Sequence, residues 1–209
     1  MRLEELDPRT LEAVAAYDNH AREYQQTLRH RRPTGDLKRF AAWLTRGDLV
    51  LDVGCGPASD LRALRDLGVH PVGVDLSMGA LQEARLLLPR HPLVRTPMSD
   101  LPFEGKPFGG LWMSGAFNHL PRSEWRDTFA HLLGFVARGP VFLSCVKGSG
   151  DMERIEDPIL GSIPRSDALE EELEALFTSH GLRDVTVELR PDPLVDQARP
   201  WVTALGHYS

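Results

Sequence analysis

The sequence predicts an α/β fold, with a mostly parallel sheet, helices on both faces and an antiparallel last strand. After Gly47, short apolar runs alternate with helix-like segments, which is the pattern of βαβ units. Five such runs, at 49–53, 70–74, 93–96, 110–114 and 141–146, predict parallel strands. Two later runs, 185–189 and 201–205, are joined by a segment with no room for another helix, so they predict an antiparallel hairpin.

Helices are expected between these strands and ahead of them. Apolar spacing predicts helices at 61–67, 81–88, 125–136 and 168–180. Two amphipathic helices, 11–28 and 37–44, are expected at the start of the chain, separated by a turn with proline and glycine. With no linker in the sequence, residues 1–209 predict one domain, in which 1–46 form N-terminal cap helices and 47–209 the core.

Residues 147–165 show no hydrophobic period and include three glycines and two prolines. That composition predicts a loop on the face where the strands end. We expect it to act as a lid over a substrate.

Composition narrows the classes of function. The net charge of −6 disfavours general binding to nucleic acid. The one basic cluster, Arg29–Arg32 with Lys38 and Arg39, is interpreted as solvated helix ends. No apolar stretch is long enough to predict a membrane span, and no secretory signal can be identified at the start.

The cysteines and histidines do not predict a disulfide framework or a metal site. Cys55 and Cys145 fall within or at the rim of the expected sheet, which favours a reducing cytoplasm. No pair of histidines or cysteines has metal-ligand spacing, so we expect no bound metal.

The most informative stretch is the strand that runs into Gly54-Cys55-Gly56. Glycines there allow a sharp turn and the close approach of a bulky ligand. Asp75 ends the next strand, nineteen residues after Gly56, where a carboxylate can accept hydrogen bonds from ribose hydroxyls. Together these features predict an adenosine-binding crevice at the carboxyl ends of two adjacent strands.

The turn also favours one kind of adenosine ligand. A dinucleotide site uses G-x-G-x-x-G to place pyrophosphate on a helix N-terminus, and the third glycine is missing here. Instead Asp52 precedes the turn, and a carboxylate there suits a ligand with an amino group and a cationic sulfonium. S-adenosylmethionine is such a ligand.

In these motifs the sequence resembles the class I S-adenosylmethionine-dependent methyltransferases, in particular small bacterial members whose first motif reads like LDVGCGPG. The likeness extends along most of the chain. It is carried by the segments LDVGCGPASD at 51–60, VDLSM at 74–78, LPF at 101–103, FGGLW at 108–112, NHLPR at 118–122, FLSCVK at 142–147 and RPW at 199–201. The resemblance implies a Rossmann-like seven-stranded sheet, S-adenosylmethionine as cofactor and methyl transfer as the activity.

The resemblance also implies roles for individual residues. Asp52 and the turn would face the methionine part of the cofactor, Asp75 its ribose, and other side chains its adenine. The cofactor-binding candidates are Tyr24, Asp52, Gly54, Cys55, Gly56, Asp75, Leu76, Met78, Met98, Ser99 and Ser114. His119 is the catalytic candidate, either as a base or as a residue that shapes the pocket. The family has an adenine-binding acid where Pro97 stands, and Ser99, Asp100 or the backbone of Met98 would compensate.

Two other classes of protein remain open at this stage. One is an NAD-dependent oxidoreductase, and the other is a non-catalytic protein that binds S-adenosylmethionine or S-adenosylhomocysteine. The absence of a large basic surface favours a small-molecule acceptor, and the sequence does not identify it. It does not predict the oligomeric state either.

Overall fold

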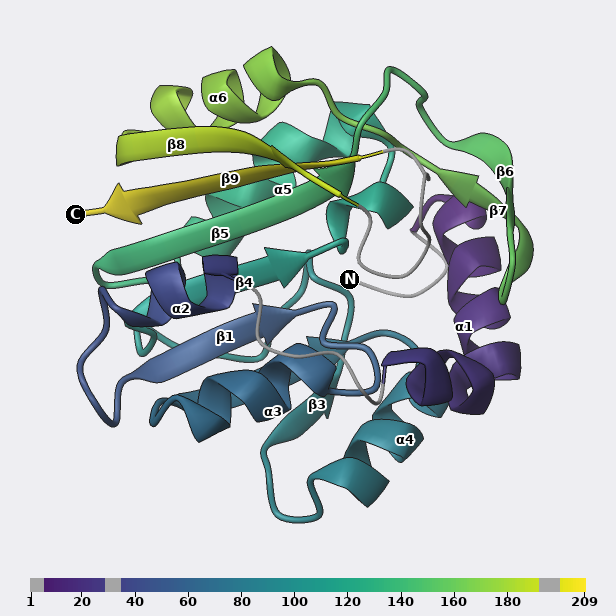
Figure 1. Cartoon of the computed structure of the whole chain (residues 1–209), viewed down its shortest axis with the longest axis horizontal. Coiled ribbons are helices and arrows are strands. Elements are labelled where there is room, and N and C mark those ends of the chain that lie inside the picture. Colours follow the sequence, from purple (N-terminus) through teal and green to yellow (C-terminus); the bar gives the residue numbers. More distant parts are fainter. Residues whose placement is uncertain (1–5, 29–34, 192–199) are drawn as a thin grey trace.

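The computed structural model describes residues 6–28, 35–191 and 200–209, and is centred on a seven-stranded sheet (Figure 1). The strand order is β3-β2-β1-β4-β5-β9-β8. The strands are β1 Leu49–Val53, β2 His70–Asp75, β3 Leu93–Arg95, β4 Gly110–Ser114, β5 Gly139–Val146, β8 Arg183–Arg190 and β9 Trp201–Tyr208. All seven lie close to the predicted runs.

The sheet is parallel from β3 to β5, and β9 then pairs antiparallel with both β5 and β8. This confirms the predicted mostly parallel sheet with an antiparallel last strand. Because β9 inserts between β5 and β8, the final hairpin extends the sheet beyond β5.

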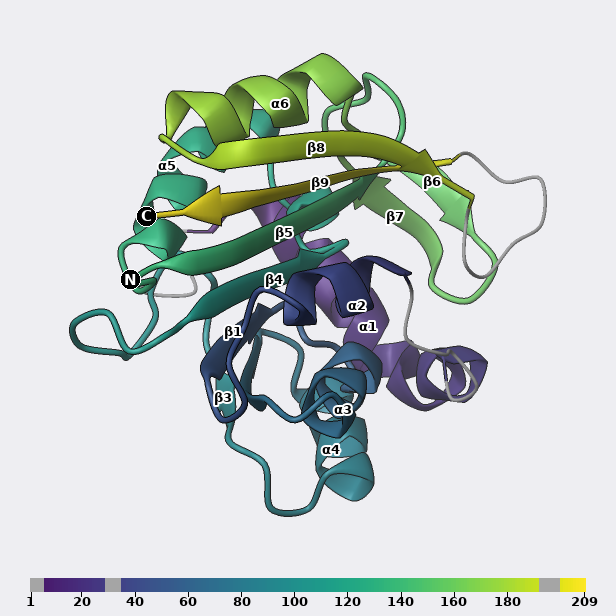
Figure 2. The same cartoon turned by 60° about the vertical axis from the view of Figure 1, so that its left-hand side comes forward.

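Helices cover both faces of the sheet, as predicted (Figure 2). They are α1 Pro8–Leu28, α2 Gly35–Ala41, α3 Ser59–Asp66, α4 Met78–Leu87, α5 Arg122–Leu133 and α6 Glu170–Ser179. Helix α2 ends before the predicted position and supplies buried core residues, Leu37 and Phe40. The first helix begins three residues earlier than predicted.

The two-residue period of the strands sorts their side chains between two cores. Val50, Trp112 and Phe142 face α2 and α3, and the Trp112 and Phe142 rings stack with centroids 3.9 Å apart. Residues on the opposite face, including Leu51 and Leu143, pack against α5 and α6. Burial on both faces explains why the central strands are continuous apolar runs.

The segment 147–165 was expected to be a loop, and this was wrong. It contains an antiparallel hairpin of β6 Glu153–Asp157 and β7 Gly161–Arg165, separate from the main sheet. Ile163 is buried at 2% exposure, and β7 contacts α1, beside which the hairpin lies (Figure 1). The hairpin is therefore held by tertiary packing rather than by a strong local strand pattern.

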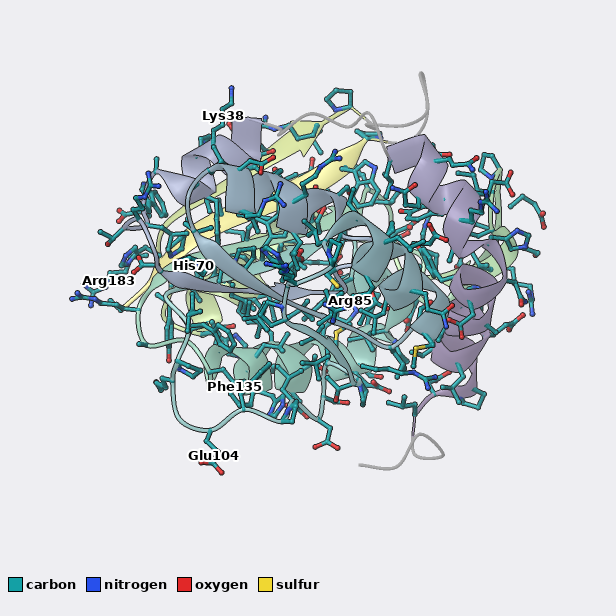
Figure 3. The ribbon with its side chains drawn as sticks, turned by 90° about the horizontal axis from the view of Figure 1, so that it is seen from below. Lys38, His70, Arg85, Glu104, Phe135 and Arg183 are labelled. Carbon is teal, nitrogen blue, oxygen red and sulfur yellow. The ribbon has the colours of Figure 1, made fainter. Side chains whose placement is uncertain are left out.

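Surface features bear on two other expectations. Across residues 6–28, 35–191 and 200–209, the structure contains no helix long and apolar enough to cross a bilayer. Of the basic cluster, residues 29–32 lie outside the described parts of the chain. Lys38 is exposed and projects away from the fold (Figure 3), and Arg39 forms an ion pair with Glu188.

Candidate functional site

A cavity of about 460 Å³ opens where the parallel strands end, and its volume is in the range of small-molecule sites. Its floor is formed by the ends of β1, β2, β4 and β5, while α1 and the β6–β7 hairpin contribute the opposite wall. Open α/β sheets commonly bind ligands at this edge. The cavity lies where the sequence predicted a crevice.

The glycine turn after β1 forms one side of the cavity. Gly54 and Gly56 have φ angles of +68° and +51°, which side chains rarely adopt. A Cβ on Gly54 would lie 2.7 Å from the Cβ of Ala116, so the turn packs tightly on that side. A Cβ on Gly56 would meet no atom within 4 Å, although this residue lines the cavity. The open space at Gly56 can therefore hold part of a ligand.

Asp75, at the end of β2, lies beside this turn. Its Oδ2 accepts a hydrogen bond of 2.8 Å from the amide of Gly56, and its Oδ1 accepts one of 2.8 Å from the amide of Ser77. Each carboxylate oxygen has further lone pairs for a ligand hydroxyl. Burial raises the pKa of Asp75, and the two amide donors oppose that shift. The carboxylate thus fixes the turn and faces the cavity at once.

Beyond Asp75, the wall continues into a mixed apolar and polar strip. Leu76, Met98 and Ser99 line it, as do Thr96 and Pro97, which were not among the candidates. These residues follow β2 and β3 in the chain. A flat ring next to Asp75 would contact this strip.

At the other end of the cavity, His119 follows β4 in a short 3₁₀ helix, Phe117–His119. Its Nε2 lies 3.1 Å from the hydroxyl of Tyr17 on α1. Burial, with a smaller contribution from Arg165, lowers the pKa of His119 to about 4. The imidazole is therefore neutral at neutral pH, a state suited to hydrogen bonding and weakly basic.

Helix α1 is fixed against the cavity by Asp18. Its Oδ1 accepts hydrogen bonds from the hydroxyl of Ser77 at 2.6 Å and the amide of Gly79 at 2.8 Å. Tyr24, on the same helix, lines the cavity and packs edge-on against Tyr17. Ser114, at the end of β4, also lines it.

Three candidates do not line the cavity: Asp52, Cys55 and Met78. Asp52 is buried within β1 and shares the strand face of Val50, because strand side chains alternate. Cys55 is buried in a cluster with α3 and α4, and burial raises the pKa of its thiol well above the ordinary value. Met78 is the first residue of α4 after the N-cap Ser77, and it is 41% exposed.

The structure adds residues that the sequence did not single out. Asp157 and Arg165, from the β6–β7 hairpin, line the cavity near His119. Because this segment was expected to be a loop, no periodic signal pointed to them. Neither Cys55 nor Cys145 is in a disulfide, and both are buried. In the part of the chain that the structure describes, no three metal-ligating side chains gather, and the absence of a metal stays a prediction.

The fold and site thus define a Rossmann-like α/β protein with a cavity at the carboxyl ends of its parallel strands. Residues 50–139 match the family model described as "Methyltransferase domain". The chain is 31% identical over 99 residues to malonyl-[acyl-carrier protein] O-methyltransferase of Pseudescherichia vulneris, covering 47% of this chain and 39% of that protein. The chain is 27% identical over 138 residues to the Salmonella typhimurium protein of the same name, and the match covers 65% of this chain and 54% of that protein. The chain thus spans about half the length, or less, of these curated relatives.

A solved structure supports the same fold. The Burkholderia thailandensis 1,6-didemethyltoxoflavin-N1-methyltransferase, solved with bound 1,6-didemethyltoxoflavin and S-adenosylhomocysteine, aligns with a TM-score of 0.71 over 100% of this chain and 93% of that one. At 19% identity this likeness is one of fold. Together with the match of residues 50–139 to the methyltransferase-domain model, it shows that the chain has the Rossmann-like fold found in S-adenosylmethionine-dependent methyltransferases.

Proposed function

We propose that this protein is an S-adenosylmethionine-dependent methyltransferase that acts on a small-molecule acceptor. The observation that carries the proposal is the pairing of Asp75 with the glycine turn. A half-buried carboxylate and an open glycine backbone share one wall of the cavity, joined by the hydrogen bond from Gly56 to Asp75. This arrangement suits a ligand with a ribose diol and a bulky chain beside it.

The residues present fit the cofactor. Asp75 would accept the ribose hydroxyls, the strip formed by Leu76, Met98 and Ser99 would contact adenine, and the open space at Gly56 would hold the methionine chain. The cofactor supplies an electrophilic methyl group on a sulfonium.

The chain's own contribution to methyl transfer is positioning and exclusion of water. Such a displacement needs the nucleophile in line with the methyl carbon, so alignment accounts for much of the rate. Ser114 and His119 lie on the cavity wall after β4, where an acceptor would approach. Helix α1, fixed by Asp18, would close the site from water.

With a pKa of about 4, His119 is a weak base, so its proposed part is to orient the acceptor as a neutral hydrogen-bond partner. A role as general base would require an acceptor that is acidic or already ionised. A second candidate acceptor is a group attached to a carrier protein, because two relatives are named malonyl-[acyl-carrier protein] O-methyltransferase. The volume of the cavity, about 460 Å³, supports a small molecule as the first.

The oxidoreductase alternative is disfavoured by the sheet. An antiparallel β9 between β5 and β8 agrees with the methyltransferase fold of the solved relative. The non-catalytic alternative has no specific observation in its favour.

Calorimetric titration of the protein with S-adenosylhomocysteine, S-adenosylmethionine and NAD tests the proposal. We expect both adenosyl ligands to bind and NAD to give no heat. Binding of NAD with no response to either adenosyl ligand would contradict it.

A further inference from the structure

Arg165 lines the cavity, and only one of the three nitrogens of its guanidinium has a partner among the described residues. It ends β7, and its side chain is 18% exposed. Its Nε donates a hydrogen bond of 2.8 Å to Oδ1 of Asp167, which is 4% exposed. Among the described residues, the two terminal nitrogens of Arg165 have no hydrogen-bond or ion-pair partner.

The contact with Asp167 leaves a specific recognition surface free. A guanidinium has five N–H donors in a rigid plane, and the Nε bond uses one of them. The edge formed by the two terminal nitrogens offers parallel donors whose spacing matches the two oxygens of a carboxylate. Because Asp167 fixes the plane of the group, little side-chain entropy remains to be lost on binding.

The rest of this wall is mainly apolar. The apolar side chains that line the cavity include Leu6, Val14, Leu120, Ile155 and Ile163, of which Ile155 and Ile163 lie on the same hairpin as Arg165. Two neighbouring polar groups have partners within the fold: Oδ1 of Asp157 accepts the amides of Ile159 and Leu160, and the hydroxyl of Thr10 donates to the carbonyl of His119. Among the residues that the structure describes, the terminal nitrogens of Arg165 thus supply donors on this wall that have no partner.

We propose that Arg165 binds a carboxylate of the methyl acceptor, so that the substrate class is a small organic acid with an apolar body. The inference rests on the proposed function and specifies the acceptor for the same cavity. The acid is held by the terminal nitrogens of Arg165, and its body packs against the apolar wall formed by α1 and the hairpin. The lowered pKa of His119 is consistent with this cation near the imidazole.

The test measures binding of simple acids to protein saturated with S-adenosylhomocysteine. The probes are butanoate, hexanoate, octanoate and phenylacetate, each paired with its primary amide. Dissociation constants come from ligand-observed NMR. At least one acid should bind about 10- to 100-fold more tightly than its amide, the usual size of a charge-assisted hydrogen-bonded pair.

Three variants show whether Arg165 is responsible. Arg165→Gln should abolish the preference for the acid, while Arg165→Lys should keep part of it, because lysine retains the charge without the fork. Arg154→Gln is the matched control, because Arg154 lies on the same hairpin, is 58% exposed and does not line the cavity. It should keep the full preference. Thermal unfolding checks that each variant is folded.

Several results would overturn the inference: no acid binding more tightly than its amide, a preference that survives in Arg165→Gln, or a loss of S-adenosylhomocysteine affinity in that variant. The last result would assign Arg165 to the cofactor's own carboxylate. Failure of the wild type to bind S-adenosylhomocysteine would contradict the proposed function instead. Acid binding measured without the cofactor then still tests Arg165.

Discussion

The hydroxyl of Tyr17 lies 3.1 Å from Nε2 of His119, and their rings meet edge-on with centroids 5.1 Å apart. The contact joins α1 to the segment after β4 across 102 residues of sequence. Burial raises the pKa of Tyr17 well above its ordinary value and lowers that of His119, so both groups are neutral at neutral pH. The pair therefore connects the wall formed by α1 to the proposed acceptor end of the cavity.

His119 should make stability depend on pH in a defined window. The pKa of His119 in the folded protein, about 4, is below the ordinary histidine value of 6.5, so between these values the unfolded state binds more protons and stability falls as pH falls. The whole pKa shift corresponds to a change of at most about 3 kcal/mol in the free energy of unfolding. The free energy of unfolding should be measured with urea at several pH values between neutral pH and pH about 4. Over this range it should fall less in His119→Gln than in the wild type. Equal losses would contradict the burial of a neutral imidazole.

Gly79 should be intolerant of a methyl group. In a helix, alanine is usually more stable than glycine by about 1 kcal/mol. Here a Cβ on Gly79 would lie 2.7 Å from the carbonyl oxygen of Asp18 and 2.9 Å from its Cα. Gly79→Ala should therefore displace α1, lower the free energy of unfolding and speed exchange of the α1 amides. Asp18→Ala removes the carboxylate that accepts hydrogen bonds from Ser77 and Gly79, so it should also speed exchange of the α1 amides. If Gly79→Ala were more stable than the wild type, α1 would not be packed against this position.

In the ion-pair network between α2 and β8, Asp36 should contribute more to stability than Glu188. Asp36 is 4% exposed and accepts hydrogen bonds of 3.0 and 2.9 Å from Arg190. Glu188, whose side chain is 42% exposed, pairs with the same arginine. Asp36→Asn should lower the unfolding free energy by about 1–3 kcal/mol and Glu188→Gln by less than about 1 kcal/mol. The reverse order in chemical unfolding would contradict this assignment.

Asp75 should be required for cofactor affinity. Asp75→Asn replaces one acceptor oxygen by a donor, so it loses a ribose contact and one amide bond of the turn. Affinity for S-adenosylhomocysteine should fall roughly 10- to 150-fold, the size of a lost hydrogen bond to a charged group. The control is Asp127→Asn, at an exposed position on α5. Unchanged affinity in a folded Asp75→Asn would place the ribose elsewhere.

The sequence predicted those parts of the site that depend on local pattern. The strand, the glycine turn and Asp75 are adjacent or regularly spaced in the chain, and their geometry follows from positive φ and from parallel pairing of β1 with β2. Ala58 also has a positive φ, +69°, a conformation that favours glycine, and the LDVGCGPG-type motif that the sequence resembles has glycine at this position.

Features that depend on tertiary packing were not predicted. The β6–β7 hairpin includes Pro164, and the adjacent burial of Ile163 and Pro164 interrupts the alternation of buried and exposed side chains along β7. Arg165 reaches the cavity only because that hairpin forms. The N-cap at Ser77 fixes the exposed position of Met78, and this depends on backbone geometry that a motif does not specify.

A crystal structure of the protein with S-adenosylhomocysteine would test the central claim most directly. We predict density for the ribose within hydrogen-bonding distance of Asp75, for adenine against Leu76 and Met98, and for the homocysteine chain over Gly56. Density in another part of the molecule, or a ribose out of reach of Asp75, would contradict the claim that this cavity is the cofactor site of a methyltransferase.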